Sequence, residues 1–123
     1  MKKANQIIYG IFGALAILFG VVALLFPGTV ISEADRTGLV MHLLREEGAA
    51  GIFIGLMAIW CIFNYEKRVV VHYFLIVFAF LMAAIHWLDY LTGHRQLMSP
   101  LINTVPFMLL VLMSRSQTTA REG

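Results

Sequence analysis

Residues 7–28 read IIYGIFGALAILFGVVALLFPG, and this stretch decides the class of the fold. Its first twenty residues carry no charge, and Pro27 and Gly28 close the run. A helix that crosses a bilayer needs about 20 mostly apolar residues. The run is longer than the roughly 7–15 apolar residues of a secretory signal peptide, and no small-x-small cleavage site follows the run before Pro27. We therefore expect residues 7–26 to form a retained first membrane-spanning helix.

The whole chain shares this apolar character, because 60% of its 123 residues are hydrophobic and only 13% are charged. Ordinary globular domains carry roughly 25% charged residues. A soluble domain of this length exposes too large a share of its surface to hide so many apolar side chains. The composition therefore indicates lipid as the solvent, and the scattered basic residues give no nucleic-acid footprint. The single cysteine, Cys61, excludes an internal disulfide and a multi-cysteine metal site.

Three further segments, 48–63, 69–88 and 97–114, are apolar along most of their length. Ser99 and Pro100 open the last of them as a helix cap followed by a proline at the first helical position. Backbone groups in lipid must be paired within the segment, and no two-residue alternation supports a barrel. We predict an all-α integral membrane bundle of four helices, a single transmembrane domain over residues 1–123.

The connection between the first two spans contains DRTGLVMHLLREEGAAG from Asp35 onward, with apolar residues at helical spacing. Two readings are open: an amphipathic helix over 35–47 on the outer interface, or a second span that begins there. A span over 48–63 alone would be about 24 Å long, shorter than a hydrocarbon core of about 30 Å. We therefore expect Glu46 and Glu47 to be drawn toward the membrane.

Lysine and arginine placement predicts the orientation. Four spans put the N-terminus, the 64–68 loop and the C-terminal tail on one side. Six basic residues fall on that side and three on the other, namely Lys2, Lys3, Lys67, Arg68, Arg115 and Arg121 against Arg36, Arg45 and Arg95. The excess predicts that both termini of this multi-pass protein lie in the cytoplasm.

Small residues recur every three or four positions in the first two spans. Gly13 and Gly20 belong to this pattern in the first span, and Gly51 and Gly55 form a GxxxG in the second. Small side chains on one face let two helix backbones approach closely in lipid. We predict that these glycines form helix-packing faces, although the sequence does not say which helix or subunit they meet.

Polar side chains gather at the predicted outer ends of three spans, beginning with the stretch AIHWLDYLTGHR at 84–95. The candidate cluster consists of Arg45, Glu46, Glu47, His86, Asp89 and Asn103. Ionisable groups at membrane depth are costly and indicate a functional site by default. The alternative is that these groups lie among the lipid headgroups and pair only to hold helices together. Both readings stay open at this point.

Three other chemistries can be weighed on spacing. His72 and His86 are fourteen residues apart, as in membrane cytochromes that stack two haems, but no other predicted span contains a partner histidine. A metal site from His86, Asp89 and His94 fits the spacing, yet His94 lies beyond a glycine and off the helix. Cys61 has no base nearby in its span. We assign no catalytic residue, no metal ligand and no cofactor.

Three stretches, GALAILFGVVALLFPG, LLREEGAAGIFIGL and LDYLTGHR, resemble the small DoxX-like four-helix membrane proteins of bacteria. Some proteins of this type are membrane subunits of quinone-linked redox complexes. The resemblance therefore implies a prokaryotic plasma membrane and an accessory or quinone-adjacent role. It transfers no residue-level site.

Together these patterns predict a non-enzymatic accessory or scaffold subunit that packs in the bilayer against other membrane subunits or copies of itself. The alternative is a binding module for a quinone or a lipid headgroup at the outer polar cluster. A small transporter or a haem-carrying anchor ranks lower, because transport needs charges near the midplane and the central parts of all four spans carry none.

Overall fold

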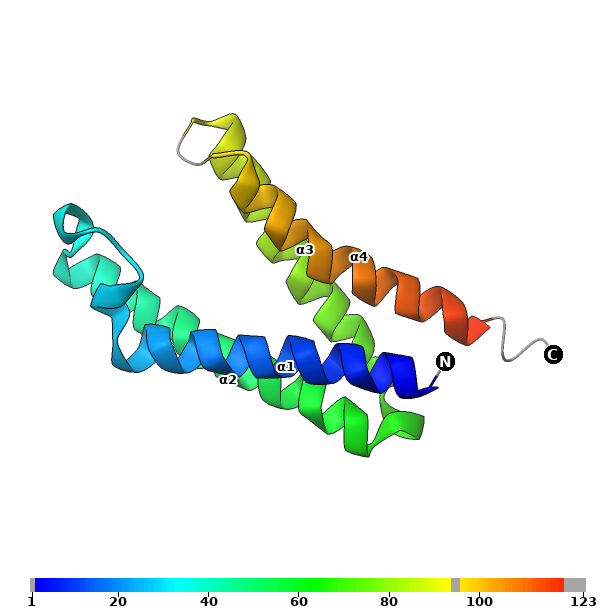
Figure 1. The fold of residues 1–123 in the computed structure, drawn as a ribbon. Helices are drawn as coiled ribbons and strands as arrows, with labels where there is room; N and C mark the ends of the chain where they lie inside the picture. The colour runs from blue at the N-terminus through cyan, green and yellow to red at the C-terminus, as the bar shows by residue number, and fades with distance from the viewer. Residues whose placement is uncertain (1, 94–95, 119–123) are drawn as a thin grey trace. The chain divides into compact units, whose positions relative to one another are not determined.

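The computed structural model describes residues 2–93 and 96–118, with side chains through Ser114, and all regular elements of this part are helical. Four α-helices form its frame, and three short 3-10 turns lie in the connections (Figure 1). The α-helices are α1 (Lys2–Leu25), α2 (Gly38–Phe63), α3 (Val69–Leu91) and α4 (Met98–Thr118). The turns are η1 (Pro27–Thr29), η2 (Glu33–Asp35) and η3 (Tyr65–Lys67). The expected all-α class is confirmed.

Three of these helices, α1, α2 and α3, are long and apolar enough to cross a membrane, and the apolar part of α4 is shorter, Met98–Ser114. Large apolar side chains stand exposed along all four helices, among them Leu15, Phe53, Phe74 and Leu112. Such a surface would be unstable in water and suits contact with lipid. The helices also extend past the predicted spans, because α1 begins at Lys2 and α3 continues to Leu91.

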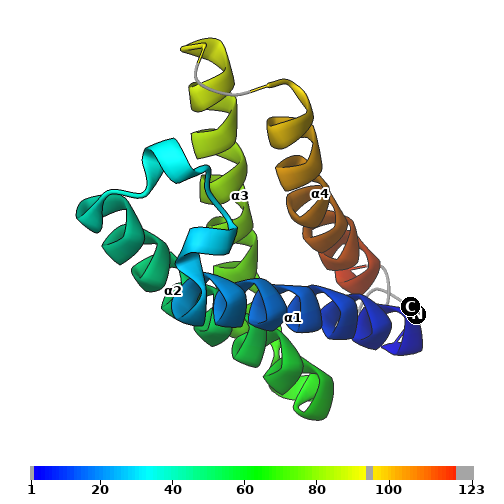
Figure 2. The ribbon, with the colours of Figure 1, turned by 60° about the vertical axis from the view of Figure 1, so that its left-hand side comes forward.

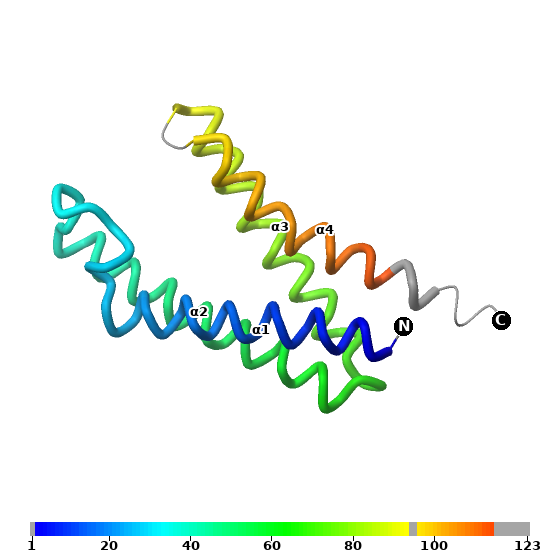
Figure 3. The backbone as a smooth tube through the Cα atoms, viewed as in Figure 1, coloured from blue at the N-terminus to red at the C-terminus, as the bar shows by residue number. Residues whose placement is uncertain are grey.

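Residues 35–47 do not form a separate interfacial helix. Figure 3 traces α2 as one uninterrupted helix from Gly38 to Phe63. Its start is capped by Thr37, whose hydroxyl oxygen accepts a hydrogen bond from the Val40 backbone N–H at 3.3 Å. No proline interrupts residues 38–63, so the helix that begins at the cap continues. At about 39 Å, α2 is longer than a hydrocarbon core. The reading in which the second long helix begins within residues 35–47 therefore holds.

The chain divides into two compact units, each built around a helical hairpin. The α1–α2 unit comprises Tyr9–Tyr65, and the α3–α4 unit comprises Met1–Ile8 with Glu66–Gly123. The first turns of α1 therefore belong with α3 and α4. Within each unit the two long helices run side by side in opposite directions (Figures 1 and 2).

In the α1–α2 unit the two helix backbones touch at glycines. A Cβ atom added to Gly20 would lie 2.6 Å from the Gly48 carbonyl oxygen, and one added to Gly48 would lie 2.6 Å from the Gly20 oxygen. A second crossing point joins Gly13 to Gly55, with an added Cβ at Gly13 only 2.9 Å from the Gly55 oxygen. Gly51 lies between them against α1. Only glycine permits this approach, because real Cβ atoms essentially never come within 3.0 Å of such neighbours.

In the α3–α4 unit the core is made of side chains instead. Leu75 of α3 and Leu110 of α4 are almost fully buried. The rings of Phe80 and Phe107 pack with centroids 5.5 Å apart. Gly93 follows the end of α3 with a φ of 80°, the left-handed conformation that commonly terminates helices at glycine. The hairpin is thus held by apolar contacts, to which the polar contacts below are added.

Candidate functional site

Two residues of the predicted polar cluster, His86 and Asn103, contact Ser99 in the α3–α4 unit. The hydroxyl of Ser99 shares a hydrogen bond of 2.9 Å with Nδ1 of His86 on α3. The amide nitrogen of Asn103 donates to the Ser99 backbone oxygen at 2.9 Å. His86 and Asn103 are both half-buried. The two predicted residues therefore converge on one serine, at the point where α3 ends and α4 begins.

Ser99 does not act as the predicted helix cap. The helix α4 begins at Met98, so Ser99 lies inside its first turn, where its N–H bonds to the Gln96 carbonyl at 3.1 Å. Its hydroxyl is directed to the imidazole of His86 instead. The predicted capping role of Ser99 is therefore wrong, because the helix begins one residue earlier and the hydroxyl bonds His86 instead.

Two further hydrogen bonds link the same helices. The indole N–H of Trp87 donates to the hydroxyl of Thr104 at 3.0 Å, and Thr104 donates to the Pro100 carbonyl at 2.7 Å. Nε2 of His72 lies 2.8 Å from the hydroxyl of Ser114. We call these contacts, with the one at Ser99, the polar ladder: His86–Ser99, Trp87–Thr104 and His72–Ser114. The ladder joins α3 to α4 near both ends of the hairpin.

Neither the role of Ser114 nor the pairing of Trp87 with Thr104 is predicted from the sequence alone. The pairing can be read from the sequence spacing once the last two helices are assumed to form an antiparallel hairpin. Going back along α3 from His86 to His72 covers nearly the same number of residues as going forward along α4 from Ser99 to Ser114. The two histidines weighed as haem ligands each hydrogen-bond a serine of α4.

Three residues of the predicted cluster lie on α2, in the α1–α2 unit. Glu46 pairs with His42 one turn earlier, at 3.2 Å. Arg45 and Glu47 are exposed, and within the described residues of their unit neither forms a hydrogen bond or an ion pair. That these residues share a level with His86 stays a prediction, and His94 and Arg95 lie outside the described residues.

Asp89 completes the set of predicted cluster residues. It lies one helical turn after His86 on α3 and is half-buried. Among the described residues of its unit, its carboxylate has no hydrogen-bonding or ion-pairing partner. No group of three or more His, Cys, Asp or Glu side chains in the described residues is arranged to hold a metal ion. Cys61 is buried in α2.

Comparisons of the chain with protein-family models, with curated proteins and with solved structures give no match.

The Trp87–Thr104 bond can be tested by removing its donor. Trp87→Phe is expected to lower the free energy of unfolding by about 0.6 kcal/mol, the average value of a side-chain hydrogen bond between membrane helices. Tyr90→Phe is the matched control, because within the described residues the Tyr90 hydroxyl has no hydrogen-bond partner. Denaturant unfolding in mild detergent measures both. Equal stability of the two variants would show that the bond contributes nothing.

Proposed function

We propose that the chain is a non-enzymatic accessory or scaffold subunit of a membrane assembly, formed with another membrane protein or with copies of itself. The observation that carries this proposal is the polar ladder. His86 and Asn103, which a ligand site would need, already bind Ser99. The His86 hydrogen bond links α3 to α4 and the Asn103 hydrogen bond lies within α4, while apolar side chains on the same helices stand exposed. A packing role accounts for both features.

The proposal includes four membrane crossings. The ladder holds α4 beside α3 from His86 down to His72, which is fourteen residues or about 21 Å along the helix. A helix kept at the side of a membrane-spanning neighbour over this depth crosses with it. The lysine and arginine excess then supports cytoplasmic positions for both termini.

Glu47 is the residue that we propose meets the partner. It lies sixteen residues before Phe63, the last residue of α2, and so about 24 Å along the helix. With Phe63 at the inner boundary, Glu47 falls inside a hydrocarbon core of about 30 Å. Charged side chains are expensive in that environment and almost always pair with other polar groups. A polar side chain of a neighbouring subunit would stabilise the exposed Glu47 carboxylate.

The test is the mass of particles extracted from the native membrane directly into polymer-bounded discs. Glu47→Gln removes the charge and keeps the shape, and it is expected to release the partner and leave a lighter particle. Glu33→Gln is the matched control, because Glu33 is an exposed acid in the short turn η2 outside the spans. Unchanged particle masses for the wild type and both variants would contradict a role of Glu47 in assembly.

A second candidate function is the binding of a quinone or a lipid headgroup at the outer cluster, and Asp89 favours it. Nδ1 of His86 is fixed by Ser99, which leaves Nε2 and the nearby Asp89 carboxylate for a ligand. Asp89→Asn would then abolish the co-purification of a small molecule seen by mass spectrometry, while the thermal unfolding midpoint stays unchanged. The scaffold proposal predicts the same bound molecules in both proteins.

A further inference from the structure

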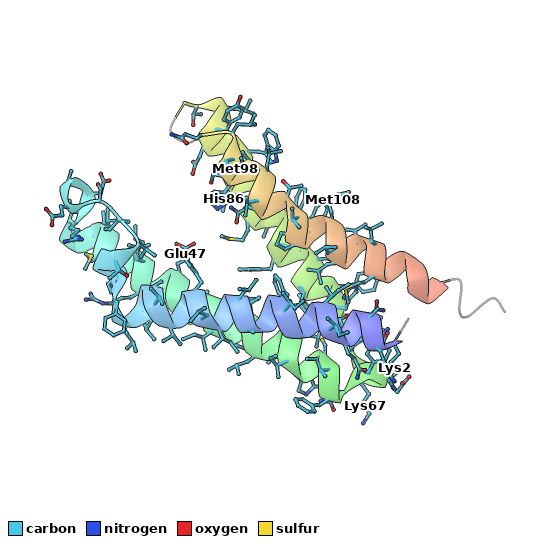
Figure 4. The ribbon with its side chains drawn as sticks, viewed as in Figure 1. Lys2, Glu47, Lys67, His86, Met98 and Met108 are labelled. Carbon is cyan, nitrogen blue, oxygen red and sulfur yellow. The ribbon has the colours of Figure 1, made fainter. Side chains whose placement is uncertain are left out.

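We propose that the α3–α4 unit binds an anionic phospholipid of the surrounding leaflet at the end where α1 and α3 begin. Lys2 and Lys3 open α1, and Lys67 lies in η3 just before α3. The ammonium group of Lys2 lies 2.9 Å from the carboxylate of Glu66, the neighbour of Lys67, so these segments adjoin. Figure 4 shows Lys2 and Lys67 at this same end. This partner is a lipid, distinct from the protein partner proposed above.

The charge at this end is positive even after the ion pair is formed. The stretches 1–8 and 66–69 contain four basic residues and the single acid Glu66. The hydrogen bond and the positive charge of Lys2 lower the pKa of Glu66 below its ordinary 4.5, so Glu66 stays ionised at neutral pH and is matched by Lys2. Lys3 and Lys67 are exposed, and within the described part of their unit neither forms an ion pair.

Exposed apolar surface begins directly beside these lysines. Ile7 follows Lys3 by one helical turn, and Val70 and Phe74 follow Lys67 along α3. These three side chains are 61%, 64% and 70% exposed. Lysine stems lie readily along such surface while their ammonium groups stay at the polar boundary. The surface therefore offers cations for a headgroup next to an apolar face for acyl chains.

Only one class of ligand uses both features. A soluble phosphate would meet the lysines but gain nothing from Ile7, Val70 and Phe74. A zwitterionic lipid would cover the apolar face but carries no net charge to complement the lysines. A phospholipid with a net negative headgroup uses both, and basic residues next to a membrane attract such lipids. We expect each lysine to strengthen retention by about fivefold, the equivalent of ~1 kcal/mol.

The test uses the full chain reconstituted in bilayers with equal phosphatidylglycerol and phosphatidylcholine. Native mass spectrometry after mild detergent extraction counts the lipids of each kind that remain bound. The wild type is expected to retain phosphatidylglycerol preferentially. Lys3→Gln with Lys67→Gln should lose this preference, and Lys3→Arg with Lys67→Arg should keep it. Both lysines are exposed, so these variants leave the packing of the unit unchanged.

The control is Arg36→Gln, which removes an exposed positive charge from the α1–α2 unit. It should retain phosphatidylglycerol as the wild type does. Equal retention of both lipids by the wild type would overturn the proposal, and so would an equal loss in the control. Displacement of phosphatidylglycerol by millimolar inorganic phosphate would also overturn it, because the ligand would then be a soluble phosphate group.

Discussion

Gly48→Ala is expected to force α1 and α2 apart and to lower the free energy of unfolding by about 1–3 kcal/mol or more. The added Cβ would lie 2.6 Å from both the Gly20 carbonyl oxygen and the Leu24 backbone nitrogen. Backbone atoms cannot rotate away as a flexible side chain would, so a whole helix must shift. Denaturant unfolding in mild detergent, followed by circular dichroism, measures the change.

Gly10→Ala is the matched control on α1. There the added Cβ would meet only the end of the Ile62 side chain, at an ordinary van der Waals distance of 3.6 Å. Alanine is the better helix former, so this variant should be as stable as the wild type. If Gly48→Ala were no less stable than Gly10→Ala, the close contact of α1 with α2 would be contradicted.

The second prediction is that α4 crosses the membrane, so that the residues before and after it lie on opposite sides. A reporter that is active only in the cytoplasm is expected to be active at the end of the full chain. When it is fused after residue 93, the same reporter should be inactive. A second reporter, active only outside the cytoplasm, should be active when it is fused at that position. Each crossing moves the following residue to the opposite side of the membrane, so the two positions differ only if α4 crosses.

A fusion just after Phe63 is the control, since it follows two crossings and should report the cytoplasm. If the full chain and the chain ended at 93 gave the same side, α4 would lie on the membrane surface. The four-span proposal would then be wrong, while the three long apolar helices would remain.

Composition and the lengths of apolar runs are sufficient to predict the helical membrane class. Residues 7–26 and 69–88 carry no charge, so nothing competes with a spanning helix. The start of α2 was harder to predict, because residues 38–47 mix apolar and charged side chains as an interfacial helix does. The Thr37 cap and the absence of proline favour a continuous helix. Neither feature can be recognised from hydropathy alone.

The polar contacts depend on register, which single residues do not reveal. His86 and Asn103 were identified because charged and amide groups stand out at the end of a span. Ser114 was missed because a lone serine at the end of an apolar helix has no distinctive pattern. Its partner His72 lies forty-two residues earlier in the chain, and only the antiparallel pairing of α3 with α4 brings them together.

The most direct test of the accessory-subunit proposal is gentle-detergent purification of the tagged native protein. Mass spectrometry identifies what co-purifies, and a visible spectrum of the same sample reports any haem. We predict a partner protein, or further copies of this chain, at fixed stoichiometry and a spectrum without a Soret band. A monomeric protein that carries a quinone, a stoichiometric small molecule or a haem would contradict the proposal.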